Sequence, residues 1–153
     1  MTDDATKTTV KRGVDCIGVC VSFLLHDGNG GVLLHKRSEK CRDECGNWDC
    51  GAGALEFGES FEASLRREIT EEVCAEIIEI KALGARNVLR EHQGIATHWV
   101  AVRYAVQVDP TQVQNGEPEK IDEIGWFTIG TLPNPKHTML NDMIEAAQAA
   151  GIL

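Results

Sequence analysis

The sequence predicts a single-domain α/β protein, in which helices cover both faces of a mixed β-sheet to form an α/β/α sandwich. The first observation is the order of the apolar patterns, which runs strand, strand, loop, helix, strand, strand, strand, helix. The second is length, because 153 residues can bury one hydrophobic core without a second domain. The third is composition, since 42% hydrophobic and 25% charged residues are ordinary for a globular protein.

The chain opens with a tail and a hairpin. Residues 1–12 are rich in Thr, Lys and Asp, so we expect a flexible tail before a domain that spans 13–153. Residues 14–25 alternate small side chains with large apolar ones, which predicts a central strand. A glycine-rich turn at 27–31 then leads into a partner strand at 32–36.

The remaining elements surround a central helix. Residues 37–47 are polar and irregular, and residues 48–53 are expected to form a loop at the mouth of the site. Beyond the central helix we expect strands at 77–85, 96–108 and 123–127, a polar turn at 91–94, a loop at 116–120, a tight turn at 131–133 and a helix at 137–150.

The central helix is predicted from about Phe61 to Cys74. Ser60 is a good N-cap, and the acidic residues of the first turn favour the positive end of the helix dipole. Apolar residues recur every four positions, at Phe61, Leu65, Ile69 and Val73. This line of side chains predicts the face that packs on the sheet.

Three carboxylates of this helix indicate a metal site. Glu68, Glu71 and Glu72 fall within an arc of about 100° that overlaps the apolar line, so they face the body of the protein. Like charges at these spacings cost a helix about 0.2–0.5 kcal/mol per pair. A hard divalent cation such as Mg²⁺ or Mn²⁺ would offset that cost, because it prefers oxygen ligands. The alternative is a solvated acidic face without a metal.

The stretch from Gly53 to Ala75 resembles the Nudix box, Gly-x5-Glu-x7-Arg-Glu-aliphatic-x-Glu-Glu-x-Gly-aliphatic. Two positions depart from it, because Cys74 stands where the family has glycine and Ala75 is small for an aliphatic residue. Glycine eases a helix into a left-handed turn, so Cys74 leaves the geometry of that turn open. The matching residues are Gly53, Glu59, Arg67, Glu68, Ile69, Glu71 and Glu72.

The resemblance implies the Nudix fold and metal-assisted hydrolysis, with the Gly53 carbonyl as a further ligand beside the three carboxylates. Glu71 or a glutamate downstream is the candidate general base, acting with Glu68 at the catalytic centre. Arg67 is expected there as a structural partner of a box carboxylate rather than as a substrate ligand. Glu59 would support the metal through water, orient Arg67, or simply favour the helix dipole.

Candidate substrate contacts lie outside the box. Arg86 and Arg90 are the best candidates for cations that face a phosphate, against the alternative of solvated surface arginines. The nucleobase is expected near Trp48 and the segment 86–98, where His98 is interpreted as a core histidine. The resemblance suggests that Glu117 or Glu119 supplies an extra acid, although a solvated acidic loop explains both equally well.

The expected reaction is Mg²⁺-dependent hydrolysis of a nucleoside diphosphate linked to another moiety. Partly by analogy with the family, the preferred substrate is a (d)NTP, cleaved to the monophosphate and pyrophosphate. ADP-ribose or a nucleotide sugar is the alternative within the enzymes. A module that binds a nucleotide without cutting it is the alternative outside them, but such modules usually carry a degenerate box and this one keeps its acids.

Charge and composition limit the partners. The net charge of −9 argues against binding a nucleic acid polymer, so the partner is a small nucleotide, with a homodimer as a possible assembly. No apolar segment suits a signal peptide or a membrane span, which predicts a cytoplasmic protein with reduced cysteines. Three of the six cysteines, Cys41, Cys45 and Cys50, are close enough in sequence to raise a zinc site, but plain loop thiols are favoured.

Overall fold

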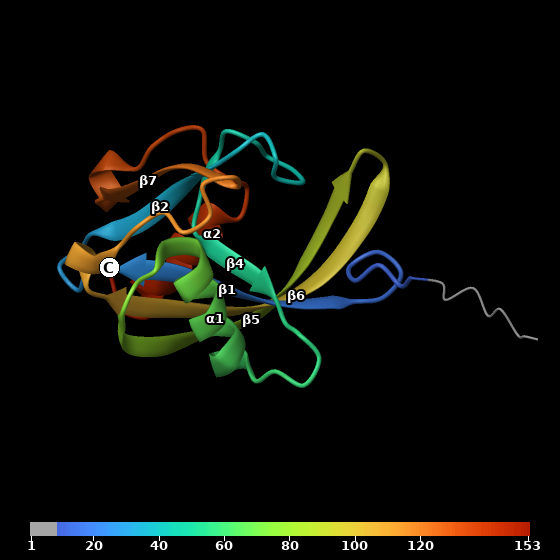
Figure 1. The fold of residues 1–153 in the computed structure, drawn as a ribbon, viewed down its shortest axis with the longest axis horizontal. Coiled ribbons are helices and arrows are strands. Elements are labelled where there is room, and N and C mark those ends of the chain that lie inside the picture. The colour runs from blue at the N-terminus through green and yellow to red at the C-terminus, as the bar shows by residue number, and fades with distance from the viewer. Residues whose placement is uncertain (1–8) are drawn as a thin grey trace, which may run out of the picture.

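The computed structural model describes residues 9–153 as one domain with a mixed sheet of seven strands and two α-helices (Figure 1). The first eight residues of the predicted tail lie outside this range. The elements are β1 Gly18–His26, β2 Val32–Arg37, β3 Trp48–Asp49, β4 Gly51–Ala54, α1 Phe61–Val73, β5 Ile77–His92, β6 Ile95–Val108, β7 Ile121–Phe127 and α2 Leu140–Ala149, with short 3-10 helices at Pro110–Gln112 and Ile129–Thr131.

The sheet is mixed, as predicted. Its strand order is β3-β2-β1-β6-β5, while β4 pairs with β1 and β7 pairs with β2. Strand β1 runs parallel to β6 and antiparallel to both β2 and β4. Strand β1 therefore lies at the centre of the sheet, as the alternation of residues 14–25 indicated.

One helix packs on each face of the sheet, which confirms the α/β/α sandwich. Phe23 and Leu25 of β1 pack with Leu65 and Ile69 of α1 in one buried cluster. The intervening Leu24 packs with α2 residues in a second cluster on the other face. Successive side chains of a strand point to opposite faces, so the alternation within β1 separates the two halves of the core. Neither helix among the described residues is long and apolar enough to cross a bilayer.

Two of the expected assignments before the central helix are wrong. The predicted strand at 14–25 begins only at Gly18, because residues 11–16 form a hydrogen-bonded turn in which the Gly13 N–H donates to the Cys16 carbonyl at 2.7 Å. The predicted loop at 48–53 contains strands β3 and β4. The run Gly-Ala-Gly-Ala has no apolar alternation, so only its backbone pairing with β1 identifies it as a strand.

Strands β5 and β6 form a long antiparallel ribbon whose tip projects from the body of the molecule (Figure 1). Both strands extend to the turn at Gln93 and Gly94, well past the predicted end of the first strand at residue 85. The N-terminal segment is bonded to the ribbon, since the His98 N–H donates to the Gly13 carbonyl at 2.8 Å. Trp99 fills the space that side chains at Gly13 and Gly18 would otherwise occupy.

Helix α2 begins at Leu140 rather than at the predicted residue 137. The preceding segment is held along β3 by two backbone hydrogen bonds, from the Trp48 N–H to the Pro135 carbonyl and from the His137 N–H to the Trp48 carbonyl, both 2.8 Å long. These bonds hold the backbone beside β3, so the helix starts after them. As a result His137 faces the cavity described below rather than lying within α2.

Candidate active site

Helix α1 carries the box residues and has defined caps at both ends. The Ala63 N–H donates to the Ser60 hydroxyl at 3.1 Å, as expected for an N-cap. At the other end Cys74 adopts the left-handed conformation with φ 55°, and its N–H donates to the Thr70 carbonyl. The turn that glycine would make is therefore formed by cysteine. Phe61 is the one member of the predicted apolar line that stays largely exposed, at 43%.

The three box carboxylates are buried to different degrees. Glu72 is buried, the Glu68 side chain is mostly covered, and the Glu71 side chain is half exposed at 49%. Strand β4 makes room for them, because a Cβ at Gly53 would overlap the Glu68 carboxyl group, and a Cβ at Gly51 would overlap the Phe23 ring and also crowd Glu72. The two glycines thus let the helix carboxylates lie directly against the strand.

The carboxylate of Glu72 lies in an unfavourable environment for a negative charge. Burial, together with the charges of Glu68 and Glu117, raises its pKa well above the usual range. Among the described residues its Oε2 atom is buried without a hydrogen-bond partner. Burial also raises the pKa of Glu68, although the Arg67 guanidinium acts in the opposite direction. A buried carboxylate oxygen without a donor has the character of an unfilled ligand position.

Arg67 holds the acids in place. Its guanidinium donates to both oxygens of Glu59, at 2.8 and 3.0 Å, and to Glu68 at 2.6 Å. A longer contact of 3.4 Å reaches Glu71. The hydrogen bonds from Arg67 lower the pKa of Glu59 to about 2. This geometry agrees with the expected role of Arg67 as a structural partner of a box carboxylate, oriented by Glu59.

The structure brings one of the two downstream acids to the box. The loop after residue 113 lies on the end of α1, where the Gly116 N–H donates to the Glu72 carbonyl at 2.9 Å. Glu117 is close enough for its charge to raise the pKa values of Glu68 and Glu72, and it accepts from Lys120 Nζ at 3.0 Å. Glu119 instead pairs with Lys40 at 3.3 Å and is exposed.

The residues around Glu72 fit a hard divalent cation. The side chains of Glu68, Glu71 and Glu72 all offer carboxylate oxygens as metal ligands, which is the ligand type that Mg²⁺ and Mn²⁺ prefer. The Oε2 atom of Glu72, which is buried without a hydrogen-bond partner among the described residues, is the structural sign of such a site. The box therefore has the chemistry of a metal site.

A cavity of about 360 Å³ lies on the opposite face of the sheet, beside α2. Residues 52–54 of β4 line it, so the same strand borders both the cavity and the box. Its floor consists of small side chains, and its walls carry five of the eight arginines of the chain. The walls also include the carboxylates Asp43, Asp49 and Asp142.

The candidate substrate contacts take different positions. Arg86 and Arg90 both line the cavity, where Arg86 pairs with Asp142 and Arg90 pairs with Glu44 at 2.6 Å. Trp48 is instead buried in the α2-side core, its ring edge-on to Phe127 at 5.1 Å, and it does not line the cavity. The expected contact between Trp48 and the nucleobase therefore does not fit the structure, because backbone pairing of β3 turns this ring into the core.

Trp99 lines the cavity in place of Trp48, which the sequence did not indicate. The interpretation of His98 as a core histidine is also wrong. His98 is only partly buried on the ribbon, where its Nε2 lies 2.9 Å from the Asn87 side-chain oxygen.

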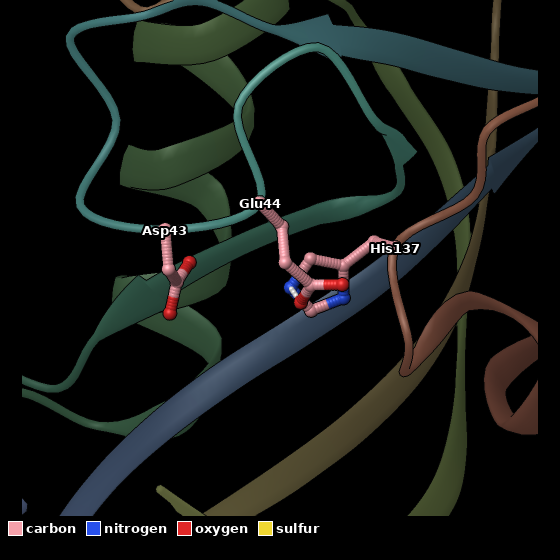
Figure 2. A group of neighbouring side chains, drawn as sticks. All are labelled: Asp43, Glu44 and His137. Carbon is pink, nitrogen blue, oxygen red and sulfur yellow. Dashed lines mark ion pairs between the residues drawn. The ribbon is translucent and has the colours of Figure 1, made fainter. Parts of the chain in front are cut away.

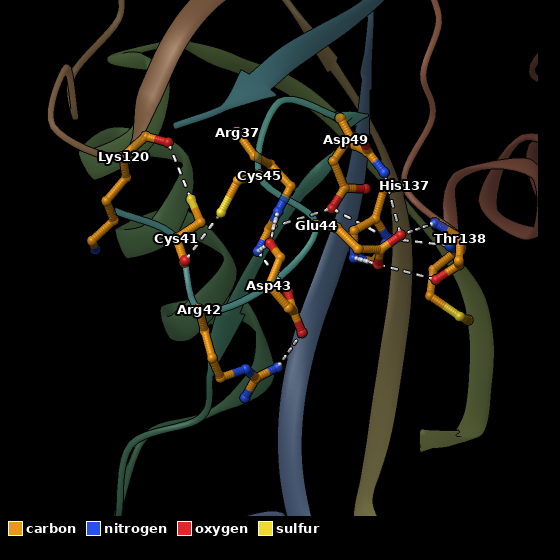
Figure 3. A network of polar contacts seen from close by, with 12 residues as sticks. Arg37, Cys41, Arg42, Asp43, Glu44, Cys45, Asp49, Lys120, His137 and Thr138 are labelled. Atoms are coloured by element: carbon orange, nitrogen blue, oxygen red, sulfur yellow. Dashed lines mark hydrogen bonds and ion pairs between the residues drawn. The ribbon is translucent and has the colours of Figure 1, made fainter. Parts of the chain in front are cut away.

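A second polar cluster was not expected from the sequence. Ligand-type atoms of Asp43, Glu44 and His137 lie within 4.8 Å of one another (Figure 2). Glu44, at φ 46°, accepts hydrogen bonds from the N–H and hydroxyl of Thr138 and lies 2.7 Å from His137 Nε2 (Figure 3). The carboxylate of Asp43 pairs with Arg37, Arg42 and Arg90. Because arginines already neutralise these carboxylates, the cluster joins the loop at 38–47 to the segment before α2 rather than leaving a metal site open.

The three cysteines considered for zinc do not form a site in the described part of the chain. Cys41 and Cys45 are free and donate weakly to the backbone carbonyls of Lys120 and Cys41, at 3.3 and 3.4 Å. Cys50 is buried among apolar residues, and burial raises the pKa of its thiol.

Comparison with known proteins gives a consistent result. The family model for the NUDIX domain matches residues 17–147. The chain is similar to a MutT NUDIX hydrolase from Burkholderia pseudomallei, with 26% identity, a TM-score of 0.74 and coverage of 84% of this chain and 96% of that one.

Two further solved structures share the fold. One is the NUDIX domain of Shewanella oneidensis NrtR complexed with ADP ribose, with 18% identity, a TM-score of 0.70 and coverage of 98% and 99% of the two chains. The other is a bifunctional NMN adenylyltransferase/ADP ribose pyrophosphatase from Francisella tularensis complexed with AMP and Mn ion, with 15% identity, a TM-score of 0.68 and coverage of 88% and 42%. Since the family model spans most of the chain and a MutT NUDIX hydrolase shares its fold, the chain belongs to the NUDIX domain family and is a pyrophosphohydrolase.

Proposed function

We propose that this enzyme hydrolyses a nucleoside diphosphate linked to another moiety, with Mg²⁺ or Mn²⁺ as cofactor, and that its preferred substrate is a (d)NTP. The products would be a nucleoside monophosphate and pyrophosphate. The observation that carries the proposal is the buried carboxylate of Glu72 on one side of β4, whose Oε2 has no hydrogen-bond partner among the described residues, with a cavity on the other side. This arrangement provides for a metal and for a nucleoside within reach of one strand.

Glu68, Glu71 and Glu72, together with the carbonyl of Gly53, would hold the cation. When bound, the cation supplies neutralisation of the diphosphate charge and polarisation of the phosphorus that water attacks. The ligand type supports this assignment, because the carboxylates of Glu68 and Glu72 lie close to the glycines of β4 and Glu71 follows Glu68 by about one turn of α1. The similar Francisella tularensis protein, which is complexed with AMP and Mn ion, favours the same class of ligands.

Residues of the chain supply the general base and hold the carboxylates in position. Glu71 is the candidate general base, because it is the most exposed box carboxylate and its one described contact, to Arg67, is long at 3.4 Å. Glu117 is the second candidate, since it lies near the box without belonging to it. Arg67 would act with Glu68 by holding that carboxylate in a fixed orientation.

Cleavage of ADP-ribose is the second candidate function. It is favoured by the similarity over almost the whole chain to the Shewanella oneidensis domain complexed with ADP ribose. A nucleotide sugar belongs to the same alternative.

The test is hydrolysis of a panel in the presence of Mg²⁺, comprising nucleoside triphosphates, ADP-ribose, nucleotide sugars and dinucleoside polyphosphates, with products identified by chromatography. We expect monophosphate and pyrophosphate from one or more triphosphates. Glu71→Gln should lower the rate by about 10²-fold or more. Arg66→Gln, which removes the exposed pair with Glu62 at 2.8 Å, is the matched control and should retain activity.

Faster cleavage of ADP-ribose or a nucleotide sugar than of every triphosphate would overturn the triphosphate assignment. The cytoplasmic location and the possible homodimer stay predictions, for which fractionation of cells and sedimentation of the purified protein are the direct measurements.

A further inference from the structure

The floor of the cavity is a row of small side chains that ends in an arginine. Ala54 of β4 is paired with Cys20 of β1, Cys20 with Ala101 of β6, and Ala101 with Arg86 of β5. These four residues lie on the face of the sheet that lines the cavity. Since neighbouring strands are about 4.8 Å apart, the row spans about 14 Å from β4 to β5. It therefore defines a direction from the box toward the far wall.

The next row has the same design. Ala52 of β4 is paired with Ser22 of β1, and Ser22 with Arg103 of β6. The small side chains again lie near β4 and the arginine lies away from it. A diphosphate bound at the box is shorter than these rows, so Arg86 and Arg103 would face the nucleoside and not the phosphate chain.

The far wall presents hydrogen-bond donors and few acceptors. Asp142 of α2 directs one carboxylate oxygen to Arg86 and the other to Arg103, the latter at 2.8 Å. Arg103 also donates to the Leu83 carbonyl, and its Nε has no partner among the described residues. Two guanidinium groups share a single carboxylate, and a guanidinium has five N–H donors and no acceptor. Donors therefore remain unused after Asp142 has accepted from both.

The other arginines of the cavity are already balanced. Arg37, Arg42 and Arg90 pair with Asp43, and Arg90 has a second carboxylate in Glu44. Arg37 also lies 3.6 Å from Asp49. The surplus of donors and of positive charge thus belongs to the wall formed by Arg86 and Arg103.

We propose that Arg86 and Arg103 read the outer edge of the nucleobase and select bases that carry a carbonyl oxygen there over bases that carry an amino group. The inference rests on the proposed function, because it assigns the cavity to the nucleoside. Hypoxanthine and uracil present an oxygen where adenine and cytosine present an exocyclic amine. A guanidinium N–H donates to such an oxygen, whereas it opposes the N–H donors of an amine. The preferred substrates are therefore nucleotides of keto bases.

The test is the binding of mononucleotides to the full chain in the presence of Mg²⁺, measured by calorimetry. IMP and AMP differ at this one edge of a purine, and UMP and CMP differ at the matching edge of a pyrimidine. None of them contains the diphosphate bond, so binding is read without hydrolysis. We expect IMP to bind about tenfold more tightly than AMP, and UMP more tightly than CMP by a similar factor.

Variants locate the effect. Arg86→Met should lower the ratio of the AMP Kd to the IMP Kd from about tenfold to about threefold or less, because one of the two guanidinium groups is removed. Arg66→Gln on the solvated side of α1 should leave the preference unchanged. Asp142→Asn should retain the preference for IMP over AMP. Without its charge, residue 142 binds Arg86 and Arg103 less strongly and leaves their N–H groups freer to donate to the base.

Equal affinities for IMP and AMP in the wild-type protein would overturn the inference and leave the proposed hydrolysis intact, as would an unchanged preference in Arg86→Met. Failure to bind any of the four mononucleotides would reject the assignment of this cavity to the base. By contrast, the absence of any metal-dependent cleavage in the substrate panel would reject the proposed function itself. The two failures are thus read in separate experiments.

Discussion

Cys74 adopts a backbone conformation that glycine reaches without strain. Its φ of 55° places the Cβ close to the following carbonyl group, which costs an L-residue about 1 kcal/mol. Gly51 and Gly53 serve a different purpose, because their missing side chains leave room for Phe23 and Glu72 at Gly51 and for Glu68 at Gly53. Glycine is thus required for space in β4, while its absence at residue 74 affects only backbone strain.

Replacing Cys74 with glycine should therefore stabilise the protein. Relief of the left-handed strain is worth about 1 kcal/mol, which corresponds to an increase of about 2–4 °C in Tm for a domain of this size. Thermal unfolding followed by circular dichroism measures the change. Cys45→Gly, at another exposed cysteine that lies outside the left-handed region, is the control and should not stabilise. A lower Tm for Cys74→Gly would show that the thiol contributes more than the strain costs.

His35 should make stability depend on pH. Burial, with the nearby charges of Arg37 and His137, lowers its pKa to about 4 in the folded protein, whereas the unfolded chain keeps a pKa near 6.5. As pH falls below about 6.5 the unfolded state takes up the proton first, so stability decreases down to about pH 4 and then levels off. The loss attributable to this residue is on the order of 3 kcal/mol.

Urea unfolding of the wild-type protein and of His35→Gln at pH 7 and pH 4.5 isolates this contribution. The difference in unfolding free energy between the two pH values should be smaller in the variant, and His92→Gln should behave as the wild type. If both proteins lose the same stability, His35 becomes protonated in the folded state without cost.

The segment from 38 to 47 is tied to its neighbours by the side chain of Glu44. Glu44 bonds to Thr138 and Arg90 and contacts His137, so one carboxylate connects the loop to β5 and to the start of α2. Its left-handed backbone shows that these bonds outweigh the strain of a non-glycine residue. The loop contributes Arg42 and Asp43 to the cavity wall, so its position affects the shape of that wall.

Glu44→Ala should destabilise the protein by about 2–3 kcal/mol, because Arg90 and Thr138 lose a charged acceptor. Glu44→Gly removes the same bonds but relieves the strain, and should recover about 1 kcal/mol of that loss. Chemical denaturation measures both. Glu39→Ala, an exposed acid of the same loop, should change stability by less than about 0.5 kcal/mol. Equal stability of Glu44→Ala and wild type would mean that the bonds of Glu44 are replaced by water.

At the scale of the whole molecule, β4 couples the two faces of the sheet. The glutamates of α1 lie against its glycines on one face, and its alanines form part of the cavity floor on the other. A cation at the box and a ligand in the cavity would therefore both contact β4. A cation at the box would also offset the mutual repulsion of the acids, so its binding should stabilise the entire domain.

Addition of Mg²⁺ or Mn²⁺ should raise Tm by a few degrees, since a ligand at one hundred times its Kd adds about 2.7 kcal/mol. Glu72→Gln should abolish most of this shift while holding or raising metal-free stability, because a buried negative charge is removed. Glu62→Gln, on the solvated side of α1, should keep the shift. Differential scanning calorimetry with and without metal makes the comparison. Unfolding of the metal-free Glu72→Gln variant would show that Glu72 serves a structural ion pair.

The sequence by itself determined the features that depend on local spacing. Helix α1 and its Ser60 cap follow from periodicity, which acts over one or two turns, whereas of the three carboxylates expected to face the body of the protein Glu71 stays half exposed. The layer order also followed, because the alternation of apolar residues in β1 already separates the two faces of the sheet. The resemblance of residues 53–75 to the Nudix box depends on the same local spacing, and it indicated the family.

Only the tertiary structure decided which distant residues meet. Strand β4 has too little side-chain pattern to be recognised and exists through its hydrogen bonds with β1. The contact between Glu44 and His137, and the sharing of Asp142 by Arg86 and Arg103, join segments that lie far apart in sequence. The sequence predicts Trp48 near the nucleobase and gives no sign of Trp99, because the face to which a ring points depends on strand register, which is set by pairing between strands.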